Sequence, residues 1–138
     1  MRTIQWQDDL SIGIGPIDKQ HKKWIEHFNR TSEALASNQS MEQISKTLGF
    51  LADYTETHFS SEEKYMKENH YPAFAQHKAL HDALCSTLAN LVHDYQEEGA
   101  TQDLADAIET FLGNWLLNHI REVDMKFGAF IAEQKKNQ

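Results

Sequence analysis

The chain has 138 residues, the length of a single domain with one substantial core. It carries 13 Lys and Arg against 21 Asp and Glu, a formal net charge of −8. Such a surface repels phosphate groups. Nucleic acid and anionic membranes are therefore poor candidates as partners. No apolar run reaches the roughly 18 residues of a membrane span, and the opening MRTIQWQDDL lacks an apolar signal region, so we expect a cytoplasmic protein without a membrane span. The single cysteine, Cys85, excludes a disulfide within the chain and is expected to be a small buried filler.

Residues 1–17 are predicted to form an extended N-terminal arm. Its apolar side chains would pack across one side of the remaining structure; they are Trp6, Leu10, Ile12, Ile14 and Ile17. The segment Ile12-Gly13-Ile14-Gly15-Pro16 is not a phosphate-binding loop, because no strand precedes it and no Gly-Lys pair follows it.

Four amphipathic segments follow the arm, each with apolar residues at alternating spacings of three and four. The helices are expected at about residues 18–36, 41–67, 72–97 and 102–133. Ser40 followed by Gln43 indicates a capping box in the turn Ser37-Asn38-Gln39-Ser40. In the turn Glu98-Gly99-Ala100-Thr101, Gly99 suits a helix C-terminus and Thr101 a helix cap. Short connections between such helices predict an all-α fold, an antiparallel up-down-up-down four-helix bundle in one domain spanning 1–138.

Histidines occupy the apolar stripe of every predicted helix. His21 precedes Trp24 by three residues and Phe28 by seven, so it lies on the stripe of the first helix. The stripes of the second and third helices carry the four-residue pairs His58 with Glu62 and His77 with His81. The stripe of the fourth helix reads Leu104, Ile108, Phe111, Leu112, Trp115 and His119. The other histidines, His27, His70 and His93, lie off the stripes and are expected to be solvated or locally bonded.

Each of these motifs is weak alone, but together they predict a metal site. Burying an unpaired ionised carboxylate costs several kcal/mol, and a buried imidazole needs partners for both nitrogens. Five histidines and at least one carboxylate converging from four helices therefore favour a cation over a purely hydrogen-bonded cluster. Imidazole and carboxylate without thiolate suit iron, manganese, zinc or copper. Helical bundles can hold paired metals between such side chains.

Asp124 follows His119 by five residues, about 140° round a regular helix and too far for shared ligation. The apolar stripe slips by one residue at the same place, since Asp124, Phe127 and Ile131 continue the rhythm one residue late. A π-bulge between His119 and Asp124 would return the carboxylate to the core. The alternative is that Asp124 is solvated and Val123 continues the stripe.

The set His21, His58-x3-Glu62, His77-x3-His81 and His119-x4-Asp124 resembles the ligand pattern of the hemerythrin family, in particular its single-domain bacterial form. The resemblance covers nearly the whole chain and implies a non-haem di-iron centre. Carried over by position, His77, His81 and His119 would hold one iron, and His21 and His58 the other. Glu62 and Asp124 would each bridge both irons beside an oxo or hydroxo bridge. That arrangement leaves one coordination position open, on the iron with two histidines. The irons would be Fe2+ in the oxygen-free form and Fe3+ in the oxygenated or oxidised form.

The resemblance implies reversible O2 binding, as carrier, store or scavenger, rather than enzymatic activity. The alternatives are a di-iron peroxidase or oxidase, and a sensor of oxygen, redox state or nitric oxide that acts through a partner protein. Five neutral imidazoles among seven ligands favour reversible binding, because oxygen-activating di-iron enzymes usually have carboxylate-rich sites. An oxygen-accepting or reductase partner remains unidentified. Besides packing in the core, neighbours of the histidines are expected to line the O2 pocket: Trp24, Phe59, Trp115, Leu116 and Ile120.

Overall fold

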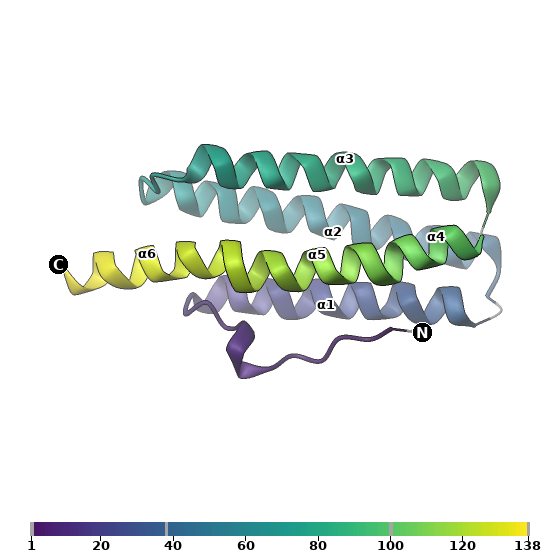
Figure 1. Cartoon of the computed structure of the whole chain (residues 1–138), viewed down its shortest axis with the longest axis horizontal. Coiled ribbons are helices and arrows are strands. Elements are labelled where there is room, and N and C mark those ends of the chain that lie inside the picture. Colours follow the sequence, from purple (N-terminus) through teal and green to yellow (C-terminus); the bar gives the residue numbers. More distant parts are fainter. Residues whose placement is uncertain (1, 38, 100, 138) are drawn as a thin grey trace.

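The computed structural model describes residues 2–37, 39–99 and 101–137, and in this part of the chain all regular structure is helical. Four long helical stretches run antiparallel and pack as a bundle (Figure 1), which confirms the predicted fold. Three of them are the continuous helices α1 (Gly15–Ala36), α2 (Met41–Glu68) and α3 (Phe74–Glu98). The fourth consists of α4 (Gln102–Asp106), α5 (Gly113–Asn118) and α6 (Met125–Lys136). Two π-helical segments, Ala107–Leu112 and His119–Asp124, join these three pieces into one stretch.

The helix ends follow the local signals of the sequence. The Ser40 side chain accepts a hydrogen bond from the Gln43 backbone at 3.2 Å, and the Gln43 side chain accepts one from the Ser40 backbone at 3.3 Å, which confirms the capping box. Gly99 ends α3 with φ 77°, a value that favours glycine. Thr101 caps α4 by accepting from the Leu104 backbone at 3.1 Å. Asn38 and Ala100, which the sequence places in these turns, lie outside the described residues.

The first helix begins at Gly15, earlier than the predicted residue 18, so the end of the expected arm is helical. Pro16 suits this first turn because its fixed φ is helical and its missing N–H has no partner there in any case. Asp18 then holds the arm, because its carboxylate accepts from the Ile12 backbone at 2.9 Å and from the Ser11 hydroxyl at 2.5 Å. The arm also contains one 3-10 turn, Asp8–Leu10, that the sequence did not indicate.

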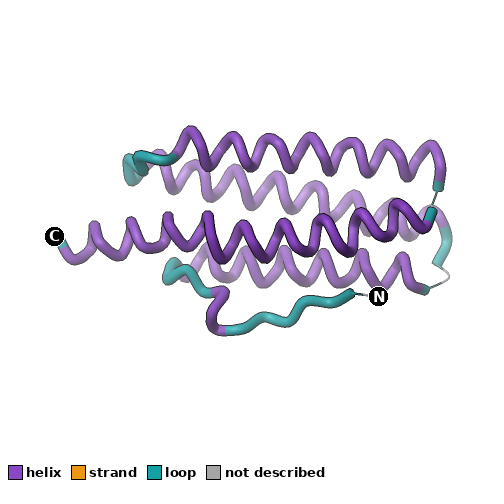
Figure 2. The backbone as a smooth tube through the Cα atoms, in the orientation of Figure 1, coloured by secondary structure: helices purple, strands orange, loops and turns teal. Residues whose placement is uncertain are grey.

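The arm lies along one side of the bundle, beside α1 (Figure 2). Among the described residues of the arm, Trp6 is partly buried, and the buried side chains include Ile4, Leu10, Ile12 and Ile14. Asn29 in α1 exchanges two hydrogen bonds with the Ile4 backbone, at 2.7 and 2.8 Å. At Gly128 in α6 the arm comes so close that an added Cβ would lie 2.1 Å from the Ile12 carbonyl oxygen. The arm therefore joins α1 to the fourth helical stretch beside the centre of the bundle.

Two expectations about the apolar residues were wrong. Phe111 is 48% exposed although it was placed on the core stripe, whereas Leu112, which was placed there too, is buried; both lie in the π-helical turn Ala107–Leu112. Cys85 is only partly buried rather than a core filler. Among the described residues, no helix combines the length and the apolar character needed to cross a membrane.

Candidate metal centre

The structure brings together all seven residues that the sequence pattern singled out. His21 comes from α1, His58 and Glu62 from α2, His77 and His81 from α3, and His119 and Asp124 from the π-helical segment of the fourth stretch. All seven are buried, and the most exposed, His119, shows 4% of its surface. The core of the bundle is therefore polar at its centre and apolar around it.

The donor atoms form two groups that share both carboxylates. One group contains Glu62, His77, His81, His119 and Asp124, and the other contains His21, His58, Glu62 and Asp124. Within each group one donor atom per residue lies within 4.8 Å of all the others. We call them the three-histidine group and the two-histidine group.

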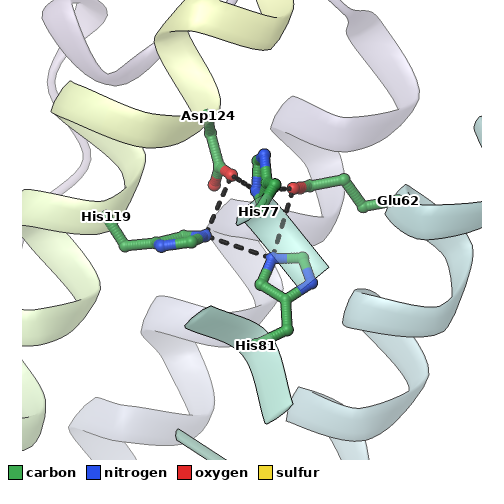
Figure 3. A group of neighbouring side chains, drawn as sticks. All are labelled: Glu62, His77, His81, His119 and Asp124. Atoms are coloured by element: carbon green, nitrogen blue, oxygen red, sulfur yellow. Dashed lines mark hydrogen bonds and ion pairs between the residues drawn. The ribbon is translucent and has the colours of Figure 1, made fainter. Parts of the chain in front are cut away.

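In the three-histidine group the Nε2 atoms face the carboxylates and each other (Figure 3). His77 Nε2 lies 2.8 Å from Glu62 Oε1 and 2.9 Å from Asp124 Oδ1. His119 Nε2 lies 3.1 Å from Asp124 Oδ1 and 3.1 Å from His81 Nε2. The nitrogen atoms of three imidazoles and one oxygen of each carboxylate thus surround a common centre.

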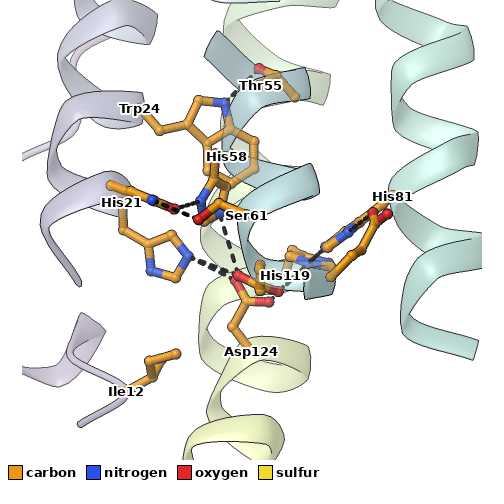
Figure 4. A network of polar contacts seen from close by, with 12 residues as sticks. Ile12, His21, Trp24, Thr55, His58, Ser61, His81, His119 and Asp124 are labelled. Atoms are coloured by element: carbon orange, nitrogen blue, oxygen red, sulfur yellow. Dashed lines mark hydrogen bonds and ion pairs between the residues drawn. The ribbon is translucent and has the colours of Figure 1, made fainter. Parts of the chain in front are cut away.

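The two-histidine group uses the remaining carboxylate oxygens, and Figure 4 shows His21 facing Asp124. His21 Nε2 lies 3.0 Å from Asp124 Oδ2 and 3.7 Å from Glu62 Oε2. His58 Nε2 lies 3.4 Å from Glu62 Oε2. Each carboxylate therefore directs one oxygen to each group, which is the geometry of a ligand that bridges two cations.

The π-helical turn His119–Asp124 places both of its terminal side chains in the cluster, as the five-residue spacing predicted. Asp124 is fully buried, so the alternative of a solvated Asp124 is wrong. Val123, which would have replaced it on the stripe, is only partly buried at the edge of the helix.

The buried polar atoms of the cluster do not satisfy one another. In the described part of the chain, every fully buried side-chain nitrogen or oxygen without a hydrogen-bond partner belongs to this cluster; these atoms lie on His21, His58, Glu62, His77 and Asp124. Several approach within 3.0 Å without the angles of a hydrogen bond, as expected for donors directed at shared cations. Each such atom costs about 1–3 kcal/mol when it is left unpaired. A donor set of imidazole and carboxylate fits iron, manganese or zinc in both groups.

In the absence of metal, protons on neighbouring histidines balance the negative charge of the two carboxylates. Burial lowers the pKa of His21 and of His77, but the closely placed carboxylates of Asp124 and Glu62 outweigh it and raise both to about 9. Burial and the neighbouring charge of His21 lower the pKa of His58 to about 3.

The two carboxylates respond in the opposite sense. Burial and the charge of Asp124 act to raise the pKa of Glu62, yet the close approach of His21, His77 and His81 holds it at about 2. Burial likewise acts to raise the pKa of Asp124, and the close approach of His119, His21 and His77 holds it well below its usual range. Two ionised carboxylates with two protonated histidines form a centre in which metal cations can replace the protons.

Two further polar residues hold histidines of the cluster from behind, and the sequence pattern did not reveal them. Gln20 Oε1 lies 2.8 Å from His58 Nδ1, and Glu63 Oε2 lies 2.8 Å from His81 Nδ1. Gln20 directly precedes His21 and Glu63 directly follows Glu62. Both lie beside a stripe rather than on it, so nothing in the spacing distinguishes them from polar residues that face water.

Aromatic rings cover the histidines. Phe59 stacks on His81 with ring centroids 3.8 Å apart, and Trp115 stacks on His119 at 4.4 Å. Trp24 lies 5.2 Å from the His58 ring, and its indole N–H donates to the Thr55 hydroxyl at 2.8 Å. Leu116 and Ile120 are fully buried, whereas Trp115 is partly exposed. The expected pocket residues thus lie in and around the cluster, and their role toward O2 stays a prediction.

The comparisons with known proteins agree with this geometry. The family model described as "Hemerythrin HHE cation binding domain" matches residues 13–131. A bacteriohemerythrin of Stenotrophomonas maltophilia is 38% identical over 127 residues, which cover 92% of this chain and 80% of that protein. A bacteriohemerythrin of Methylococcus capsulatus is 35% identical over 135 residues, covering 96% of this chain and 99% of that protein. A crystal structure of wild-type hemerythrin is similar with a TM-score of 0.82 and 33% identity, over 93% of this chain and 97% of that one. The chain belongs to the hemerythrin family.

Proposed function

We propose that the protein binds O2 reversibly at a pair of iron ions. One observation carries the proposal: three histidines on one side and two on the other share the same two buried carboxylates. His77, His81 and His119 would hold one iron, and His21 and His58 the other. Glu62 and Asp124 would bridge both. When bound, the iron pair would supply the coordination position and the electrons that O2 binding requires.

The unequal number of histidines determines where a small ligand fits. The two-histidine group has one protein donor fewer, so it has room for an external ligand, a principle familiar from metal sites that keep an open position. The carboxylates keep both groups at a fixed separation, since each directs one oxygen to either side.

The surroundings support reversible binding over oxygen-activating catalysis. Trp24, Phe59, Leu116 and Ile120 surround the histidines with buried apolar surface, which would exclude water and small reductants. The N–H of Trp24 is directed to Thr55, away from the cluster. Glu62 and Asp124 are committed to the centre and would not serve as general acids. An oxygen carrier, an oxygen store and an oxygen scavenger would all share this one biochemical function.

Gas exchange with the iron-loaded protein tests the proposal. Elemental analysis after expression in iron-replete medium should give two irons per chain. The anaerobically reduced protein should then take up one O2 per chain, with an optical change that reverses under vacuum. One metal per chain, or zinc only, would remove the di-iron assignment. If O2 oxidised the protein immediately and irreversibly, and the protein turned over peroxide and a reductant rapidly, the protein would be an enzyme and not an oxygen carrier.

A further inference from the structure

Two histidines of the cluster are held from behind by partners of different charge. His81, in the three-histidine group, contacts the Glu63 carboxylate through Nδ1 at 2.8 Å. His58, in the two-histidine group, contacts the Gln20 side-chain oxygen through Nδ1 at 2.8 Å. By contrast, Nδ1 of His21 and of His77 has no hydrogen-bond partner among the described residues.

The hydrogen bonds themselves determine the tautomer of both rings. An ionised carboxylate can only accept, so the Nδ1–H of His81 donates to Glu63. The Gln20 amide nitrogen donates to the Ser61 hydroxyl at 3.0 Å, which leaves its oxygen to accept from the Nδ1–H of His58. In both rings the lone pair is then on Nε2, the atom that faces the carboxylates of the centre.

Each contact also joins two helices. Gln20 lies in α1 and reaches His58 and Ser61 in α2, whereas Glu63 lies in α2 and reaches His81 in α3. Both rings are therefore fixed by a neighbouring helix as well as by their own. The Glu63 side chain is only 16% exposed, so water screens its charge weakly.

We propose that Glu63 and Gln20 are positioning residues that make the two metal positions unequal. A carboxylate draws the Nδ1 proton more strongly than an amide does, so it makes His81 the more electron-rich ligand. The three-histidine position therefore holds its metal more tightly and favours the more oxidised ion, while the two-histidine position stays more labile. This inference rests on the metal centre of the proposed function and assigns roles to two residues outside its ligand set.

Two substitutions of matched length reverse the charges. Glu63→Gln removes the charge behind His81, and Gln20→Glu adds one behind His58. Glu56→Gln, on the exposed face of the same helix as Glu63, is the control for a lost carboxylate. Circular dichroism of each variant establishes that the bundle has formed.

Stepwise removal of iron from the di-iron protein by a chelator, followed by native mass spectrometry, measures retention without any oxygen chemistry. In the unmodified protein a one-metal species should accumulate. Glu63→Gln should weaken the retention of this last metal ion by roughly 10–100-fold, the usual effect of losing a hydrogen-bond partner of a metal ligand. Gln20→Glu should slow loss of the first ion, and Glu56→Gln should match the unmodified protein.

An optical redox titration measures the direction in which each substitution shifts the reduction potential of the iron pair. A merely structural role would not produce shifts of opposite direction in the two variants. Glu63→Gln should make the first oxidation of the iron pair harder, and Gln20→Glu should make it easier. If Glu63→Gln fails to fold, Gln20→Glu alone tests the inference, through the easier oxidation expected for that variant. If the unmodified protein retains two ions and both variants behave as Glu56→Gln does, this inference falls while the proposed function stands. If the unmodified protein retains no metal, both fall.

Discussion

At His21 and His77, protons and metal ions compete for the same nitrogen atoms. Without metal, the neighbouring carboxylates keep both histidines protonated in the folded protein up to about pH 9, whereas the unfolded chain releases these protons near the ordinary histidine pKa of 6.5. Their contribution to stability is therefore fully present below about pH 6.5 and is lost as the pH rises to about 9. The lowered pKa of His58 acts in the other direction, since its contribution is present above pH 6.5 and is lost as the pH falls toward 3.

We therefore expect the metal-free protein to be most stable near pH 6.5 and less stable at pH 9. The metal-loaded protein should not lose stability over that range, because its ligand histidines are already neutral and metal affinity rises as protons leave. Urea unfolding of both forms from about pH 5 to about pH 9 measures the two profiles. Parallel profiles over the alkaline half of this range would contradict the competition between protons and metal.

Leu116 tests whether apolar surface protects the centre. It is fully buried three residues before His119, and Leu116→Asn would place an amide, and with it water, in this wall. The iron-loaded variant should oxidise to the inactive di-ferric form several-fold faster, with nearly unchanged metal content. The rate is measured optically after O2 is added to the reduced protein.

Leu91→Asn is the matched control, because Leu91 is partly buried on α3 ten residues beyond His81. Equal oxidation rates in the two variants would show that Leu116 does not exclude water from the centre. Urea unfolding separates this effect from the roughly 2–5 kcal/mol that a change at a buried leucine costs.

At the scale of single elements, the sequence predicted what depends on local chemistry. The π-helical turn before Asp124 was predictable because a buried carboxylate and a slipped stripe require the same extra residue. The second π-helical turn, Ala107–Leu112, carries no polar residue that must face the core, so Phe111 and Leu112 were equally good stripe members by spacing. Only packing in three dimensions decided between them.

The same limit applies to Gln20 and Glu63. Polar residues beside an apolar stripe usually face water, and only the approach of a neighbouring helix turns them toward a histidine. The seven residues of the cluster were predictable because they lie on the stripes themselves. A polar side chain on a stripe is buried, and this destabilises the fold unless a partner satisfies it.

The contact between the N-terminal arm and α6 depends on Gly128. A Cβ at this position would lie 2.1 Å from the Ile12 backbone oxygen, and a backbone atom cannot move aside as a flexible side chain does. Gly128→Ala should therefore displace the arm and lower the free energy of unfolding by about 1–3 kcal/mol, the usual cost of overpacking. Thermal unfolding and limited proteolysis of the arm measure the change.

Gly49→Ala in α2 is the comparison, because nothing lies within 4 Å of its added Cβ. A helical alanine should raise stability there by about 0.5–1 kcal/mol. If Gly128→Ala were stabilising to the same degree, the arm would adjust without cost and the close contact would not hold it.

The whole molecule is an apolar bundle built around a polar centre. Large buried side chains surround the cluster; they include Trp24, Phe28, Leu48, Met66, Ile108 and Phe127. These residues supply hydrophobic stabilisation along the whole bundle, whereas the cluster between them leaves buried polar atoms unpaired. Fold and centre are thus coupled, since each of the four helical stretches contributes at least one residue to the cluster.

Removal of metal should therefore lower the stability of the entire bundle. A ligand that binds only the folded state stabilises it by RT ln(1 + [L]/Kd), about 4 kcal/mol when its free concentration is a thousand times Kd. We expect the thermal midpoint of the chelator-treated protein to fall by several degrees or more, and to recover when iron is restored under anaerobic conditions. Calorimetry of the loaded, stripped and reloaded protein at pH 7 measures this. His70 and His93 are exposed, so a variant with glutamine at both positions should show the same difference between loaded and stripped forms. Equal midpoints for the loaded and stripped protein would mean that the buried residues do not hold metal in the core. A difference that disappeared in the His70 and His93 variant would place the stabilising metal at the surface instead.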